Sequence, residues 1–176
     1  MLIGASYYSE CWPIDRYPVD AQLMAAAGFN VVRMGEFAWS RFQPTKEEFK
    51  FDWMDECIGH LKANGIRVLL GTPTRVAPPW LVAQDRSVLI VNEDGSRAAY
   101  GGRYEFCLNH EGFREAAAAL VQAMVNHYRH EDGIFAWHLD NEYGVGICYC
   151  DQCAAAFQAW LRQRYGSLAE LNSRWG

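Results

Sequence analysis

The chain has 176 residues, of which 51% are apolar and 14% aromatic, and its formal net charge at pH 7 is −5. This length allows one well-packed core, and the mild charge without long acidic or basic runs argues against nucleic acid or an anionic membrane as a partner. No stretch has the ~18 apolar residues of a membrane span, and the first residues do not look like a secretory leader. We therefore expect a cytoplasmic protein whose six cysteines are thiols or metal ligands.

The first part of the chain alternates short apolar strands with helices. Residues 2–8 predict a buried first strand, and a helix follows from about 18 to 27, where Gly28 ends it. Residues 30–34 predict a second strand. Asp52 is expected to cap the next helix, and the aliphatic run in residues 67–71 is typical of a strand buried on both faces.

The second part continues the alternation after a long irregular stretch over residues 73–107, rich in proline and glycine turn signals. A helix is expected to end at residue 128, and residues 134–139 predict a fourth strand. Two more helices are expected over 154–164 and 168–175.

Strands and helices in strict alternation predict parallel strands joined by right-handed crossovers. The sequence after the first strand has no glycine-rich dinucleotide fingerprint, which argues against a Rossmann fold. A complete eight-stranded barrel needs about 250 residues. The predicted fold class is therefore α/β, of the (β/α)8 TIM-barrel type, with about the first four β/α units in residues 1–176.

The strongest chemical signal lies where the fourth strand ends. Alternation predicts one face that packs under helices and another that points into the barrel. The first face would carry Phe135, Trp137 and Leu139, and the second Ala136, His138, Asp140 and Glu142. Barrel enzymes place their chemistry at this carboxyl end of the strands, and glycoside cleavage needs a carboxylic acid that protonates the leaving oxygen. Glu142 is the candidate acid and Asn141 a candidate contact to a sugar hydroxyl. The alternative is a polar loop that only caps the strand.

A second constellation consists of cysteines. Cys148, Cys150 and Cys153 are closely spaced just before a predicted helix, and Cys107 is a plausible fourth thiolate. Four thiolates around Zn²⁺ make a closed structural site. A redox pair at the helix start and thiols that bind nothing are the alternatives. Cys57 is expected to pack in the core.

Three segments resemble the signatures of glycoside hydrolase family 42: Met34-Gly-Glu-Phe-Ala-Trp-Ser40, Leu70-Gly-Thr-Pro-Thr74 and Asp140-Asn-Glu-Tyr-Gly144. The resemblance covers essentially the whole chain in order. Members of this family are retaining β-galactosidases on a (β/α)8 barrel. Residues that follow the second strand, Glu36, Phe37 and Trp39 among them, are further candidates to line a sugar site, and Arg33 is a candidate to hold a carboxylate.

The resemblance implies specific roles. Glu142 would be the proton donor, Asn141 and Arg103 would bind the galactoside, and the four cysteines would hold a structural zinc. The substrate would be a terminal, non-reducing β-D-galactose residue, and the full-length protein could form a homotrimer. The nucleophile would be a glutamate beyond Gly176, so residues 1–176 are expected to be the truncated N-terminal half of the barrel and inactive alone.

Two other function classes stay open at this stage. A zinc-stabilised carbohydrate-binding or scaffold module would keep the aromatic residues and cysteines without catalysis. A metal-dependent hydrolase would need an open metal site with histidine or carboxylate ligands.

Overall fold

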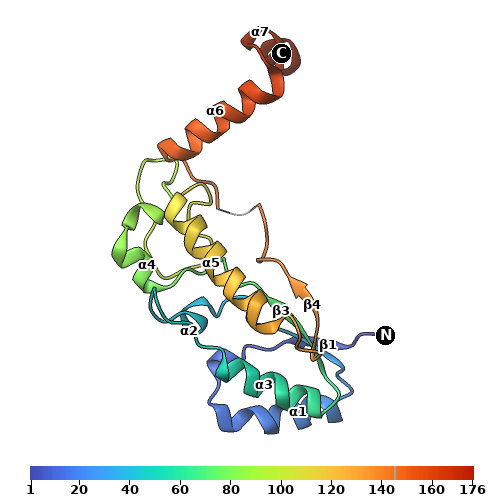
Figure 1. Cartoon of the computed structure of the whole chain (residues 1–176). Helices are drawn as coiled ribbons and strands as arrows, with labels where there is room; N and C mark the ends of the chain where they lie inside the picture. The colour runs from blue at the N-terminus through green and yellow to red at the C-terminus, as the bar shows by residue number, and fades with distance from the viewer. Residues whose placement is uncertain (145) are drawn as a thin grey trace.

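The computed structural model of the chain describes residues 1–144 and 146–176. Four parallel strands form one sheet in the order β1 (Gly4–Ser6), β2 (Val31–Met34), β3 (Arg67–Gly71) and β4 (Ile134–His138). Each strand pairs with its neighbour in the sequence, and helices lie in the connections between them (Figure 1). The predicted alternation of strands and crossovers is confirmed.

The helices differ in how they meet the sheet. Helix α3 packs on β3, α1 packs on α3, and buried residues of α5 join the same core, whereas α6 and α7 project from the far end of the molecule (Figure 1). Helix α4 and the short 3-10 turn η3 lie inside the stretch predicted to be irregular. The helical bounds are α1 Tyr17–Ala26, α2 Trp39–Phe42, α3 Asp52–Ala63, α4 Pro79–Gln84, α5 Glu111–Tyr128, α6 Asp151–Tyr165 and α7 Leu168–Trp175, and the 3-10 turns are η1 Ser9–Cys11, η2 Ile14–Arg16 and η3 Arg86–Val88.

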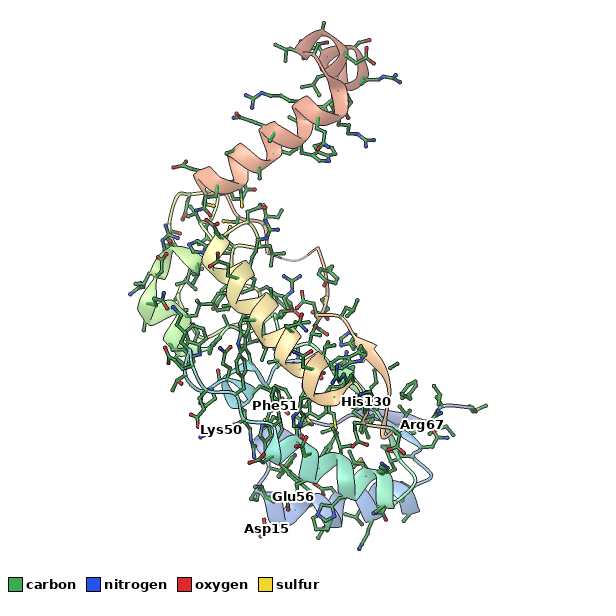
Figure 2. The ribbon with its side chains drawn as sticks, viewed as in Figure 1. Asp15, Lys50, Phe51, Glu56, Arg67 and His130 are labelled. Atoms are coloured by element: carbon green, nitrogen blue, oxygen red, sulfur yellow. The ribbon has the colours of Figure 1, made fainter. Side chains whose placement is uncertain are left out.

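One face of the sheet forms the core with the helices. Strand alternation turns Val32 and Met34 of β2 and Val68 and Leu70 of β3 toward the helices, where all four side chains are fully buried. They join buried aliphatic residues of α3 and α5, such as Met54, Ile58, Leu61, Leu120 and Met124. Phe51, just before α3 (Figure 2), stacks on His127 at the end of α5, with ring centroids 4.5 Å apart.

The other face of the sheet is open among the described residues. Arg33, Leu69 and Ala136 lie side by side in the strand register and face this side. The first strand is not buried: it pairs only with β2, and all three of its residues are exposed, as are Leu2 and Ile3 before it, at 54% and 47%. The prediction of a buried strand over residues 2–8 is therefore wrong in both burial and length.

A β-bulge changes the alternation along β4. Val68 pairs with Ile134 but Leu69 pairs with Ala136, so Phe135 is displaced from the register. Phe135 lies in the open, with the Arg67 guanidinium 4.9 Å from its ring, and Leu139 is 66% exposed. The prediction that both pack under helices is wrong. Trp137 does pack against the core, as predicted.

Two smaller features complete the fold. Asp52 is the first residue of α3, and Phe51 occupies the N-cap position without a capping side chain, so the predicted Asp52 cap is wrong. Within the part of the chain that the structure describes, no helix is long and apolar enough to cross a membrane.

Candidate active site and cysteine cluster

The loop after β4 has an unusual backbone. Asp140 and Glu142 have φ values of 56° and 51°, and Tyr104, from the long stretch before α5, has a φ of 65°. Within the described ranges these three are the non-glycine residues with positive φ. Such a conformation costs about 1–3 kcal/mol per residue and persists only where neighbouring groups hold it, most often at functional sites.

Glu142, Asn141 and Tyr104 form one hydrogen-bonded group. The Tyr104 hydroxyl donates to the exposed Glu142 carboxylate and accepts a hydrogen bond from Asn141 Nδ2 at 2.9 Å. The pKa of Tyr104 is raised, because its hydroxyl proton is held by the Glu142 carboxylate. The structure thus brings together two of the predicted site residues through a tyrosine that the sequence analysis had not singled out.

Arg75 also supports this loop, and the sequence analysis did not single it out. It is only 3% exposed, and its guanidinium donates to the backbone carbonyls of Asn141 (2.9 Å) and Glu142 (3.0 Å). It also lies 3.3 Å from a carboxylate oxygen of Asp140 and beside the ring of Tyr104, 5.1 Å from its centroid. The signal in the sequence was its position directly after the Leu70–Thr74 signature.

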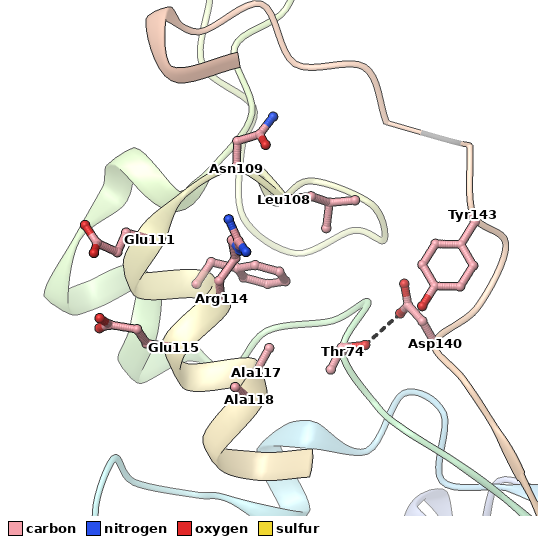
Figure 3. Close-up of a pocket in the computed structure, with 11 residues that line it drawn as sticks. Thr74, Leu108, Asn109, Glu111, Arg114, Glu115, Ala117, Ala118, Asp140 and Tyr143 are labelled. Atoms are coloured by element: carbon pink, nitrogen blue, oxygen red, sulfur yellow. Dashed lines mark hydrogen bonds between the residues drawn. The ribbon is translucent and has the colours of Figure 1, made fainter. Parts of the chain in front are cut away.

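Threonines of the same segment add two contacts. The backbone N–H of Asp140 donates to Thr72 Oγ1 at 2.7 Å, and Thr74 Oγ1 donates to Asp140 Oδ1 at 2.9 Å (Figure 3). Thr72, Thr74 and Arg75, which follow β3, therefore bind the loop that follows β4.

Arg33 links the second strand to the same site. Its guanidinium lies 3.0 Å from Glu36 Oε1 and donates to Asn141 Oδ1 at 3.4 Å, so it does hold a carboxylate, as predicted. Glu36 is fully buried, and its Cα and Cβ pass so close to Gly71 that a Cβ there would lie 2.7 Å from Glu36 Cβ. Gly71 is thus required by the close approach of the chain after β2.

The two aromatic candidates for the sugar site, Trp39 and Phe37, lie in different environments. Trp39 is fully buried and donates to Gln43 Oε1 at 2.8 Å, so the prediction that it lines a sugar site is wrong. Phe37 is partly exposed, and the Arg103 guanidinium lies 4.0 Å from its ring centroid. Arg103, the neighbour of Tyr104 in the sequence, therefore contacts the loop that follows β2.

An open cleft of about 720 Å³ lies between α5 and the loop after β4 (Figure 3). Thr74, Asp140 and Tyr143 line it from the loops, and Arg114 and Ala117 are among the residues that line it from α5. Glu142 and Asn141 are not among its lining residues. The cleft therefore borders Asp140 and Tyr143 of this loop and does not include the Glu142 carboxyl group.

The four predicted cysteines converge. The Sγ atoms of Cys107, Cys148, Cys150 and Cys153 lie within 4.8 Å of one another, with Cys107 Sγ 3.4 Å from Cys153 Sγ and 3.7 Å from Cys150 Sγ. Zinc held tetrahedrally at ~2.3 Å from four thiolates would place the sulfurs about 3.8 Å apart. The arrangement fits a metal ion bound by four thiolates.

The surroundings of the cluster act differently on its thiols: burial raises the pKa of Cys107 and of Cys153, whereas nearby donors act in the opposite sense. Val91 N–H donates to Cys148 Sγ (3.4 Å), and Asn109 Nδ2 donates to Cys153 Sγ (3.3 Å). Burial disfavours the Cys150 thiolate, but the backbone N–H of Cys153 and the neighbouring thiols outweigh it and lower the pKa of Cys150 to about 7. These donors supply the outer contacts that orient metal ligands.

The two other cysteines lie apart from the cluster. Cys57 is 1% exposed and belongs to the core, as predicted, and Cys11 is exposed.

Comparison with known proteins relates these features to one family. The family model described as beta-galactosidase, of glycoside hydrolase family 42, matches residues 6–176. A beta-galactosidase of Thermus thermophilus is 39% identical over 99% of this chain, and the match covers 28% of that relative.

Solved structures agree with the sequence matches. The polyextremophilic beta-galactosidase of Halorubrum lacusprofundi superposes with a TM-score of 0.93 at 37% identity over 100% of this chain and 27% of its own. A beta-galactosidase from the psychrophilic Marinomonas ef1 gives 0.92 at 38% identity over 100% of this chain and 27% of its own.

The chain spans little more than a quarter of the length of these relatives. The predicted fold class, the (β/α)8-barrel type with four β/α units in this chain, is confirmed. Because the match runs through the sheet, the loop after β4 and the cysteine cluster alike, the chain belongs to glycoside hydrolase family 42, the beta-galactosidases.

Proposed function

We propose that residues 1–176 form the N-terminal half of a β-galactosidase barrel and carry its general acid/base, Glu142. The observation that carries this proposal is the exposed carboxylate of Glu142 at the carboxyl end of β4, held by Tyr104 in a loop of strained backbone. Barrel enzymes place catalytic groups at this end of their strands. The names of the relatives supply the substrate class, a β-galactoside.

The chemistry assigned to Glu142 has two halves. As an acid it donates its proton to the glycosidic oxygen while that bond breaks, and as a base it later removes a proton from the water that releases the sugar. Tyr104 fixes the carboxyl group, and the exposed side of Glu142 leaves room for a substrate oxygen. Asn141 and Arg103 are proposed to bind the galactosyl hydroxyls.

A retaining reaction also needs a nucleophilic carboxylate about 5 Å from the acid. Two acidic residues near the strand ends are engaged elsewhere: Glu36 is fully buried against Arg33, and Asp140 is held by Arg75 and Thr74. We therefore propose that the nucleophile is a glutamate from a later part of the polypeptide.

The cysteine cluster is proposed to hold a structural Zn²⁺. With four thiolate ligands the ion would have no open position for water, so it would tie the start of α6 to Cys107 without entering the reaction. Assembly as a homotrimer and a cytoplasmic location stay predictions from the sequence.

The test is hydrolysis of a chromogenic β-galactoside by the product of the complete gene and by the 176-residue chain. We expect turnover by the complete product only. Glu142→Gln should lower it by ~10²–10⁴-fold, the usual contribution of a general acid or base. The matched control is Glu56→Gln, an exposed glutamate on α3 (Figure 2), which should leave turnover unchanged.

Two outcomes would contradict the proposal. Full activity in the Glu142→Gln variant would remove Glu142 from the reaction. An absence of hydrolysis in the complete product across several glycosides would favour the zinc-stabilised carbohydrate-binding module instead.

A further inference from the structure

Arg75 is placed to control the backbone on both sides of the Glu142 Cα. Its Nε donates to the carbonyl of Asn141, which belongs to the peptide bond that precedes Glu142, and its Nη2 donates to the carbonyl of Glu142 itself. The torsions of Glu142 are defined by these two peptide groups. A rigid planar guanidinium that binds both carbonyls therefore restrains the left-handed conformation of Glu142, with its φ of 51°.

The other contacts of Arg75 fix the guanidinium itself. Asp140 Oδ2 lies 3.3 Å from Nε and supplies the counter-charge in a place where both side chains are nearly inaccessible to solvent. The rings of Tyr104 and Tyr143 lie beside the guanidinium at 5.1 and 5.6 Å. Arg75 thus contacts the tyrosine that binds the Glu142 carboxylate as well as the backbone that carries it.

We propose that Arg75 is a positioning residue for the general acid. Together with Thr72, it holds the Asp140–Glu142 loop so that the Glu142 carboxyl group faces the leaving oxygen. This inference rests on the proposed role of Glu142. A lysine keeps the charge but presents one compact ammonium group in place of the planar fork, so it cannot restrain both peptide groups in the same way.

The test compares two substrates in the complete gene product. A methyl β-galactoside has a poor leaving group and needs a well-placed acid, whereas a 2,4-dinitrophenyl β-galactoside has a leaving group that departs without protonation. The value of kcat/KM reports the steps up to the first bond cleavage, in which the acid acts. Glu142→Gln defines the result for a lost acid: a large loss with the methyl galactoside and a small one with the dinitrophenyl galactoside.

Arg75→Lys should show the same selectivity in a weaker form. We expect kcat/KM to fall about 10- to 100-fold for the methyl galactoside, since misplacement by ~1 Å costs that much, and less than about threefold for the dinitrophenyl galactoside. The matched control is Arg97→Lys, because Arg97 also donates to two backbone carbonyls, those of Ser87 and Leu89, but away from the loop after β4. It should change neither value.

Thr72→Val provides a second variant that keeps the side-chain volume and removes the acceptor for the Asp140 N–H. It should shift the ratio of the two kcat/KM values in the same direction, and it decides the question if Arg75→Lys does not fold. The positioning role would be overturned if the folded variants lost kcat/KM equally on both substrates, or not at all, while Glu142→Gln showed its selectivity. If Glu142→Gln itself lacks that selectivity, the assignment of the acid fails, and the positioning role fails with it.

Discussion

At the scale of single residues, the site depends on groups that are buried, charged or strained. Glu142 and Asp140 keep left-handed backbones because Arg75 and two threonines bind them, and the buried carboxyl group of Glu36 lies against Arg33. The contacts that Arg75 and the threonines make to this loop join segments 66 to 68 residues apart, so spacing within one segment could not predict them. The identity of Glu142 and Asn141 as candidates, by contrast, followed from the sequence at the end of one strand.

Cys57 offers a prediction about pH at this scale. Burial raises the pKa of its thiol from its ordinary value of 9.0 to about 12. Its neutral form therefore stabilises the folded chain fully below about pH 9, and this contribution is lost as the pH rises from 9 toward 12, because the unfolded chain ionises first. Cys57→Ala should lose core packing, and its deficit in unfolding free energy should shrink by about 1 kcal/mol per pH unit above pH 9.

The measurement is urea denaturation of wild type and Cys57→Ala from about pH 8 to about pH 10.5, below the raised pKa. Cys11→Ala is the control, since Cys11 is exposed and should not change the dependence on pH. If the difference in unfolding free energy between wild type and Cys57→Ala stays constant or widens as the pH rises, the buried thiol does not titrate as described.

At the scale of elements, the long connection between β3 and α5 does most to build the site. Its beginning carries Thr72 to Arg75, and its end carries Arg103, Tyr104 and Cys107. The segment was predicted to be irregular, yet it contains α4 and η3 and makes antiparallel bridges between Leu89 and Phe106 and between Val91 and Arg97. Tyr149 N–H also donates to Val91 O (2.8 Å), which ties the cysteine cluster to this connection.

The metal predicted for this cluster should stabilise the connection and α6. With free Zn²⁺ at about 100 times its dissociation constant, the bound metal should raise the melting temperature by about 5–10 °C. A chelator should remove this gain. Cys107→Ser and Cys153→Ser should weaken zinc binding, whereas Cys11→Ser should not. Mass spectrometry for zinc content and thermal denaturation with and without chelator are the measurements.

The effect of a chelator on activity distinguishes a structural zinc from a catalytic one. Since the zinc would be closed to water, the complete gene product should lose thermal stability on chelation before it loses activity at low temperature. Immediate loss of turnover at full stability would instead indicate a catalytic metal.

At the scale of the whole molecule, much apolar surface is uncovered. Phe157, Trp160 and Trp175 on α6 and α7 are 50%, 46% and 59% exposed, and Leu168 is 71% exposed. Their rings contact one another, with Phe157 stacked on Trp160 at 6.0 Å between centroids. Contiguous apolar surface of this kind is typical of regions that another protein surface covers.

The 176-residue chain should therefore self-associate as its concentration rises. Phe157→Glu should shift it toward the monomer, because a carboxylate in the apolar contact loses hydration. Val19→Glu is the matched control, since Val19 is 46% exposed on α1 at the other end of the molecule. Sedimentation velocity over a concentration series measures the effect. Equal shifts by both variants, or a monomer at every concentration, would contradict the assignment of this face.

The sequence by itself determined the alternation of strands and helices, the parallel sheet, and the candidates Glu142, Asn141, Cys148, Cys150 and Cys153, because hydrophobic period and close spacing are local properties. Only the tertiary structure decided which side chains support them. Arg75 and Tyr104 reach the loop after β4 from 66 and 38 positions away, and the bulge at Phe135 arises from pairing with β3. Contacts between distant segments depend on how the elements pack, so the periodicity within one segment cannot predict them.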